Sequence, residues 1–178
     1  MIIHEIFENL IGLHCWDVYY HHALNLSMSF GQPIMRIREP KKVRSKIERV
    51  RQVRAHRLVT VRGEWWLWII SAHWNLSVRG SDEITGSSSL IKKKRALALL
   101  DGQKLTGITI NPKTSATQME FDLGAKLSIR RYSPQHNGDI WSLYQPNGFV
   151  LSVRADGQYN NDLGDMPPEQ NDWKPIVE

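Results

Sequence analysis

The sequence predicts an α+β fold built by tandem duplication, in which two units, each a helix followed by antiparallel strands, form a pseudo-two-fold sheet or a barrel-like core. The main observation is that segments 63–79 and 138–154 align without a gap and share six of seventeen residues. Self-similarity at a fixed offset is the signature of repeated structural units. We expect one compact domain, with a first unit over 1–82 and a second over 83–160.

Two glycines support this division. A short helical pattern runs into Gly12 in the first unit and into Gly102 in the second. Glycine ends helices readily because it adopts the left-handed conformation without a Cβ penalty. The second helix follows a polar connector at 80–89, in which Ser88 or Ser89 is suited to cap it.

Alternating apolar residues at 24–30 and 119–123 predict strands after each helix. The two aligned, tryptophan-containing segments then predict one antiparallel hairpin each. In the second segment, the sequence 146–148 (Pro-Asn-Gly) favours a tight turn. We expect Trp66 of the first segment and its aligned counterpart Trp141 of the second to face the core.

The composition is that of a globular protein, with 178 residues, 41% hydrophobic and 23% charged. The first residues lack a basic and apolar leader, and the longest apolar run is far shorter than a membrane span. A single cysteine, Cys15, permits no internal disulfide. These features predict a cytoplasmic protein with no membrane partner.

Charge is concentrated in two segments. Ten Lys and Arg against two acids give segment 36–57 a net charge of +8, and six acids against one lysine give segment 155–178 a net charge of −5. We expect residues 161–178 to form an acidic, extended tail. Electrostatic attraction of a partner is then a property of the basic segment alone.

The basic segment contains an insert at about 41–57 that the second unit lacks. Four apolar residues recur there at the spacing of an amphipathic helix: Val43, Ile47, Val50 and Val53. The first tryptophan segment also has an extra apolar face: Trp65, Leu67 and Ile69. We expect the basic helix to pack on this face, and any uncovered part to be an apolar interface for a partner or for a second copy of the chain.

The candidate partner-binding residues are six basic side chains of the insert: Lys41, Lys42, Arg44, Lys46, Arg51 and Arg54. They are suited to an acidic protein surface or to the phosphates of nucleic acid. The alternative is a solvated helix face, or one neutralised by the acidic tail. No nucleic-acid fold signature, such as a zinc finger, accompanies them.

Five potential metal ligands or catalytic groups lie close together near the start of the chain: His14, Cys15, Asp17, His21 and His22. Their spacing matches no zinc motif, and adjacent strand residues point to opposite faces. We expect polar strand and loop residues and no metal, and leave a functional role open. Nucleotide-binding and hydrolase motifs are absent from the sequence, so we expect no cofactor, no catalytic residues and no enzymatic activity.

Residues 96–159 carry a series of structural motifs: a helix, a glycine, a strand pair ending in F-x-x-G-x-x-L-x-I, then W-x-L and L-x-V. This series resembles uncharacterised bacterial families, some of them similar to small proteins encoded beside toxin and defence genes. The resemblance implies a protein that acts by binding partners, and it assigns no site residues. The basic insert departs from the pattern of these families.

Together, these observations predict a non-enzymatic protein that binds a macromolecular partner, such as an immunity or defence-accessory protein that blocks or regulates its target. Nucleic-acid binding through the basic helix is the alternative. An enzyme with an unrecognised site is the second alternative, which a deep pocket with convergent histidines and acids would favour.

Overall fold

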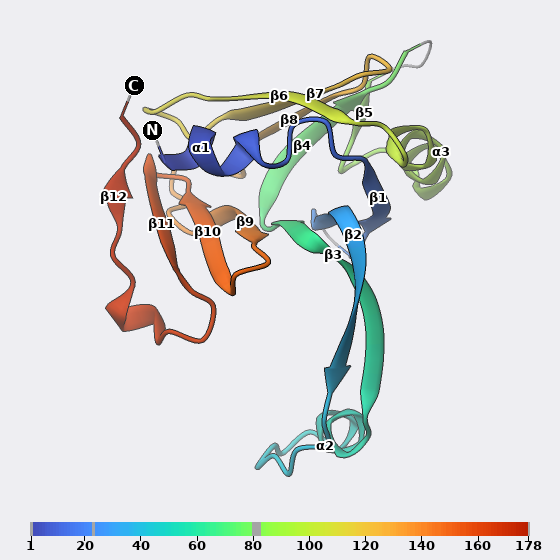
Figure 1. Cartoon of the computed structure of the whole chain (residues 1–178), viewed down its shortest axis with the longest axis vertical. Coiled ribbons are helices and arrows are strands. Elements are labelled where there is room, and N and C mark those ends of the chain that lie inside the picture. The colour runs from blue at the N-terminus through green and yellow to red at the C-terminus, as the bar shows by residue number, and fades with distance from the viewer. Residues whose placement is uncertain (1, 23, 80–82, 178) are drawn as a thin grey trace.

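The computed structural model describes residues 2–22, 24–79 and 83–177, so the expected unit boundary and residues 80–82 of the connector lie outside the described part (Figure 1). The mixed α+β class is confirmed, with strands in the majority. The helices of the described residues are α1 (Ile2–Glu8), α2 (Glu48–Ala55), α3 (Leu90–Leu100) and the short 3-10 helix η1 (Pro168–Gln170). None of them is long and apolar enough to cross a membrane.

The strands form two antiparallel sheets. The seven-stranded sheet consists, in spatial order, of β1 (Cys15–Tyr20), β2 (Leu26–Arg38), β3 (Leu58–Ile69), β9 (Asp139–Tyr144), β10 (Phe149–Arg154), β11 (Gln158–Leu163) and β12 (Lys174–Pro175). The five-stranded sheet consists of β5 (Ile84–Thr85), β4 (Ala72–Ser77), β8 (Lys126–Arg131), β7 (Thr117–Phe121) and β6 (Leu105–Ile110). Both sheets are open, so the described strands form no closed barrel.

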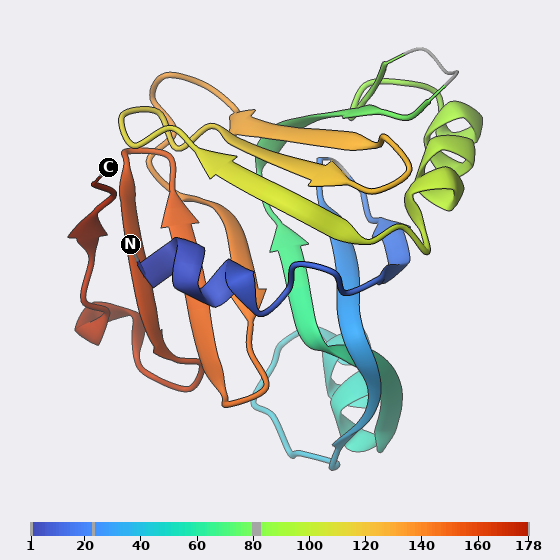
Figure 2. The same ribbon diagram turned by 45° about the horizontal axis from the view of Figure 1, so that its top comes forward.

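The buried faces of both sheets contribute to one hydrophobic core. Helix α1 lies beside β9, β10 and β11, and α3 lies at the other side of the molecule, against β1 and β5 (Figure 2). Phe7 of α1 contacts Trp141 edge to face, with ring centroids 5.8 Å apart. Burial of such large side chains dominates the stability of a core.

The chain passes from one sheet to the other between β3 and β4, and again between β8 and β9. Ser71, with φ 47°, turns the chain at the first crossing. The predicted hairpin of the first tryptophan segment is therefore wrong, because its two strands belong to different sheets. The second predicted hairpin is confirmed, with β9 paired to β10 and Gly148 at φ 86° in the turn.

Reciprocal backbone hydrogen bonds join the segments that follow α1 and α3. The amide of Gly12 donates to the carbonyl of Leu105 at 2.8 Å, and the amide of Gly102 donates to the carbonyl of Cys15 at 2.7 Å. Both glycines have a positive φ, 87° and 92°. The conformation expected of the two glycines is thus confirmed, and so is capping of α3 by Ser89, whose hydroxyl accepts from the amide of Lys92.

Trp74 and Trp141 are the largest fully buried side chains. The indole N–H of Trp74 donates to the carbonyl of Leu24 at 3.0 Å, and that of Trp141 donates to the hydroxyl of Thr117 at 2.9 Å. Trp66, which the sequence alignment pairs with Trp141, is instead only partly buried. The expectation that Trp66 faces the core is wrong.

The C-terminal residues form the far edge of the seven-stranded sheet. Tyr159 pairs with Lys174 in the β11–β12 ladder, and Ile176 is buried. The expected start of the tail at 161 falls inside β11, so removal of 161–178 would break a strand. Three strands, β9 to β11, separate this edge from β3, so the tail lies away from the basic segment.

Candidate functional site

Strands β2 and β3 extend beyond the sheet as a two-stranded ribbon, and α2 lies at its tip (Figures 1 and 2). We call residues 33–62 the arm. The arm begins at a bulge, where two residues of β2, Gly31 and Gln32, lie between the ladder pairs Phe30–Trp65 and Pro33–Gly63. Gly63 is needed there because an added Cβ would lie 2.5 Å from the carbonyl oxygen of Phe30.

One face of the ribbon is apolar. Met35 pairs with Val61 and Ile37 pairs with Val59, and paired residues point to the same side of a sheet. These four residues, the apolar arm face, are between 51% and 64% exposed. An isolated two-stranded ribbon is marginally stable in water, and this one leaves its apolar face uncovered in the described structure.

The opposite face of the ribbon is cationic. Arg36, Arg38 and Arg62 lie on this side, and they pair with residues 60, 58 and 34 of the other strand, respectively. We call them the arginine arm face. The two long faces therefore differ: the first carries four apolar side chains, whereas on the second the arginines lie opposite Ile34, Leu58 and Thr60.

The tip carries the predicted basic residues. Helix α2 spans Glu48–Ala55 and has no buried residue, so only Arg51 and Arg54 of the candidate set lie within it. The others, Lys41, Lys42, Arg44 and Lys46, precede it in a segment without regular structure. Two hydrogen bonds dock the helix to the ribbon, from the Arg38 guanidinium to the carbonyl of Val53 and from the amide of Lys41 to the carbonyl of Arg54.

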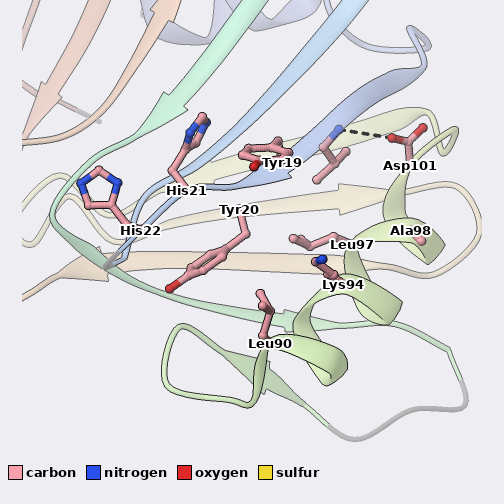
Figure 3. A pocket seen from close by; sticks show the side chains of 10 residues that line it. Tyr19, Tyr20, His21, His22, Leu90, Lys94, Leu97, Ala98 and Asp101 are labelled. Atoms are coloured by element: carbon pink, nitrogen blue, oxygen red, sulfur yellow. Dashed lines mark hydrogen bonds between the residues drawn. The ribbon is translucent and has the colours of Figure 1, made fainter. Parts of the chain in front are cut away.

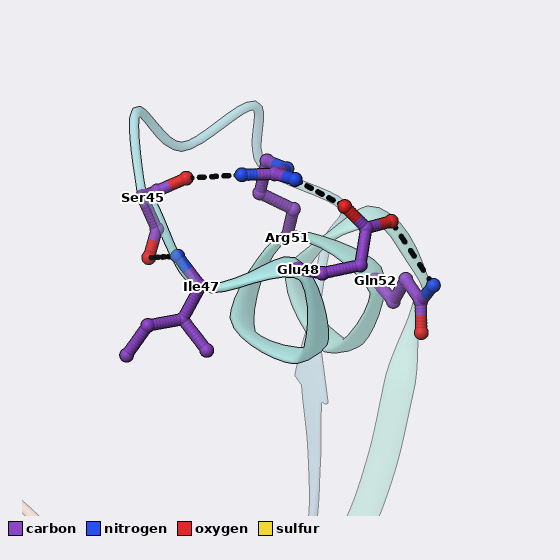
Figure 4. Close-up of polar contacts among 5 residues, drawn as sticks. All are labelled: Ser45, Ile47, Glu48, Arg51 and Gln52. Carbon is purple, nitrogen blue, oxygen red and sulfur yellow. Dashed lines mark hydrogen bonds and ion pairs between the residues drawn. The ribbon is translucent and has the colours of Figure 1, made fainter.

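The two acids of the segment are both paired. Glu48 contacts Arg51, whose guanidinium also donates to the carbonyl of Ser45 at 2.6 Å (Figure 4). Glu39 forms a bidentate pair with Arg57. Among the described residues, no ion pair neutralises the other basic side chains of 36–57, so the arm keeps its positive charge.

The predicted packing of the basic helix is wrong. Trp65, Leu67 and Ile69 are 9%, 0% and 0% exposed, and they pack in the core rather than under α2. The reason is the register of β3, whose odd-numbered residues face inward while Trp66 and Trp68 face outward. The stripe of α2 stays exposed at Ile47, Val50 and Val53.

The outer face of the seven-stranded sheet carries a cluster of rings that the sequence reasoning missed. It comprises, by ladder register or ring contact, Trp16, Tyr19, His21, Trp66, Trp68 and Tyr144. We call it the aromatic row. Ring centroids are 4.9 Å apart for Trp66–Tyr144, 5.1 Å for Trp66–Trp68 and 4.5 Å for Trp68–His21.

A pocket of about 620 Å³ lies between β1 and α3 (Figure 3). His21 and His22 line one end, and Asp101 lies at the other, where its carboxylate accepts from the amide of Val18 at 3.2 Å. The acid and the histidines therefore do not converge on one point.

The five clustered residues near the start of the chain do not form one site. Cys15 is buried, its thiol donates to the carbonyl of Leu100 at 3.2 Å, and burial, followed by the charge of Asp101, raises its pKa to about 12. Such a thiol is a poor nucleophile. His14 and Asp17 are exposed, and no group of metal ligands occurs in the described part of the chain.

His21 has a packing role. Its Nε2 lies 3.0 Å from the hydroxyl of Ser27, and its ring contacts both Trp68 and Tyr19. Burial, and then the charges of His22 and Arg62, lower its pKa. The lowered pKa favours the neutral ring, and His21 is a member of the aromatic row.

No protein-family model, curated protein or solved structure matches this chain significantly. The fold and the surfaces described above are thus the basis on which its function is argued.

Proposed function

We propose that this is a non-enzymatic cytoplasmic protein that acts by binding another protein through its arm. The observation that carries the proposal is the apolar arm face, where Met35, Ile37, Val59 and Val61 form a continuous, half-exposed patch on a projecting ribbon. An α-helix of 48–55 without buried residues, at the tip of a two-stranded ribbon, gains little stability from its own chain. A partner that covers the ribbon would supply the missing burial.

The charge of the arm suits an acidic partner. A net charge of +8 over 36–57 raises the rate of encounter with an acidic surface, and the apolar arm face then provides the lasting contact. An immunity or defence-accessory role, in which the arm blocks or regulates its target, belongs to this proposal and rests on the resemblance of residues 96–159.

The experiment is co-purification from native cells at moderate salt, with nuclease-treated and untreated samples compared. A stoichiometric protein that survives nuclease supports the proposal, and light scattering of the purified chain separates a foreign partner from a second copy. Capture of nucleic acid alone, lost when the basic residues of 41–54 are changed to Gln, favours the alternative function through the basic tip. A chain that elutes as a bare monomer argues against the proposal.

The tandem duplication is also proposed as the origin of the fold. Its support is the exchange of hydrogen bonds in which Gly12 and Gly102 play the same part, 90 positions apart. Each half then contributes a three-stranded meander, β1–β3 or β6–β8, and passes its next strand, β4 or β9, to the other sheet. In this arrangement β9 corresponds to β4, and not to β3 as in the alignment of 63–79 with 138–154.

A further inference from the structure

We propose that the aromatic row, together with the arginine arm face, binds single-stranded nucleic acid. Bases would stack on the rings, and phosphates would contact the arginines. This inference goes beyond the proposed function, because it concerns the other face of the ribbon and a different class of partner.

The rings of one row lie on β1, β3 and β9, and a serine of β2 lies between the first two. Trp16 pairs with Ser29, Ser29 pairs with Trp66, and Trp66 pairs with Tyr144, so all four side chains point to the outer side of the sheet. The next row contains Tyr19, Ser27 and Trp68 in the same arrangement. The result is a surface of rings that crosses the sheet from β1 to β9.

Small polar residues separate the rings. Ser27, Ser29, Ser142 and Ser152 lie on the same outer face and are buried between their larger neighbours. Serine side chains offer little apolar surface on which another helix or sheet could pack. We therefore interpret this face as part of the outer surface of the protein. The rings at its ends, Tyr19 and Tyr144, are 58% and 38% exposed.

The outer face of the five-stranded sheet provides a comparison. There the equivalent row is Asn75, Ser128 and Gln118, all polar, as expected for a face in contact with water. The ring pair that the described residues form there is His73 and Tyr132, tilted against each other with centroids 5.0 Å apart. A concentration of aromatic rings is therefore a property of one face and not of the whole surface.

Positive charge adjoins the rings. The guanidinium of Arg62 lies 3.8 Å from the ring centroid of Trp66, and Arg36 lies further along the same face of the ribbon. Burial, and then the charge of Arg36, lower the pKa of Arg62, so the two cations lie close enough to interact. Two acids adjoin this face: Glu64 lies between Arg62 and Trp66 in β3, with its side chain against Gly31, and Asp17 is close enough to Arg62 to interact with it.

This combination fits a single strand better than a duplex. Aromatic side chains bind unpaired bases through their π faces, which a duplex hides, while a basic track holds the backbone. Arginine beside the aromatic rings favours a nucleotide over an uncharged sugar ligand. The guanidinium binds phosphate and also stacks on the plane of a base.

The test is a titration of the full chain with fluorescently labelled oligothymidylate and oligouridylate, followed by anisotropy over a range of salt concentrations. Tyr144→Ala should weaken binding at least about fivefold, the loss of one base stack. Tyr132→Ala, an exposed tyrosine on the other sheet, is the matched control and should bind like wild type. Arg62→Gln should reduce the slope of log K against log salt by about 0.7.

Tryptophan fluorescence gives a second measurement, which needs only the wild-type chain. Bound oligonucleotide should quench part of the tryptophan fluorescence, since Trp66 and Trp68 are partly exposed in the row. Preference for either oligonucleotide supports the proposal and identifies the nucleic acid.

Absence of binding at low salt overturns the proposal, and so do equal effects of Tyr144→Ala and Tyr132→Ala. Duplex bound as tightly as the single strand, or binding lost only when the basic residues at the tip are changed to Gln, also overturns it. Val59→Asp, on the apolar arm face, should leave oligonucleotide binding within about twofold of wild type, apart from the added charge. Oligonucleotide binding and binding of the proposed protein partner can therefore fail independently of each other.

Discussion

Gly12 and Gly102 have the same left-handed backbone conformation, φ 87° and 92°, and each donates its amide proton to a carbonyl of the opposite half. No other heavy atom lies within 4 Å of the Cβ that either glycine would carry as alanine. The two positions therefore require glycine for its conformation and not for space.

Alanine at either glycine should cost about 1–2 kcal/mol of unfolding free energy, the penalty of a left-handed non-glycine residue. Gly12→Ala and Gly102→Ala should be destabilised equally in urea unfolding. Gly107→Ala is the control, because this position also has open space but no positive φ. Costs that differ widely between the two variants would argue against their equivalence.

Thr117→Val tests the buried contact of Trp141. The indole N–H would lose its acceptor at 2.9 Å in a fully buried environment, so we expect a loss of about 1–3 kcal/mol. Thr109→Val, at an exposed strand position, should change stability by less than about 0.5 kcal/mol. Equal unfolding midpoints for both variants would show that this hydrogen bond is not important.

Cys15 predicts an alkaline loss of stability. Its pKa is raised by burial from 9.0 to about 12, so above pH 9.0 the unfolded chain has lost the thiol proton while the folded chain retains it. The contribution of this thiol is fully present below pH 9.0 and declines as pH rises towards 12. Cys15→Ala removes this dependence, so the difference in unfolding free energy between wild type and variant should shrink between these two pH values. A constant difference would contradict the buried, protonated thiol.

Val59→Asp tests the apolar arm face. Because Val59 is half-exposed and lies outside the core, the thermal unfolding free energy should change by less than about 0.5 kcal/mol. Capture of the protein partner should nevertheless be lost, since a carboxylate would be buried without a counter-charge. Thr60→Asp introduces the same charge on the opposite face of the ribbon and should retain the partner.

The sequence predicted those features that depend on local conformation. Positive φ at Gly12 and Gly102, the cap at Ser89 and the turn at Gly148 follow from the steric freedom of glycine and the hydroxyl of serine. These requirements do not depend on which strands become neighbours.

The sequence could not predict which face of β3 is buried. Its residues 65–70 are apolar on both faces, so alternation gives no direction, and a shift of one residue exchanges core and surface. The inward side follows from the pairing with β2, in which Trp65 lies opposite Phe30, and this pairing cannot be read from the sequence of β3 alone. A usable signal was the alternation of Val59 and Val61 with Thr60 and Arg62, which extends β3 back to the end of the expected helical insert at 57.

The most direct measurement is photo-crosslinking in native cells, with p-benzoylphenylalanine placed at Val59 on the apolar arm face and, separately, at exposed Thr109 on the five-stranded sheet. The proposed function predicts one discrete protein adduct from position 59 and none from position 109. The same adducts from both positions, or none from position 59, would contradict the arm as the surface through which this protein acts.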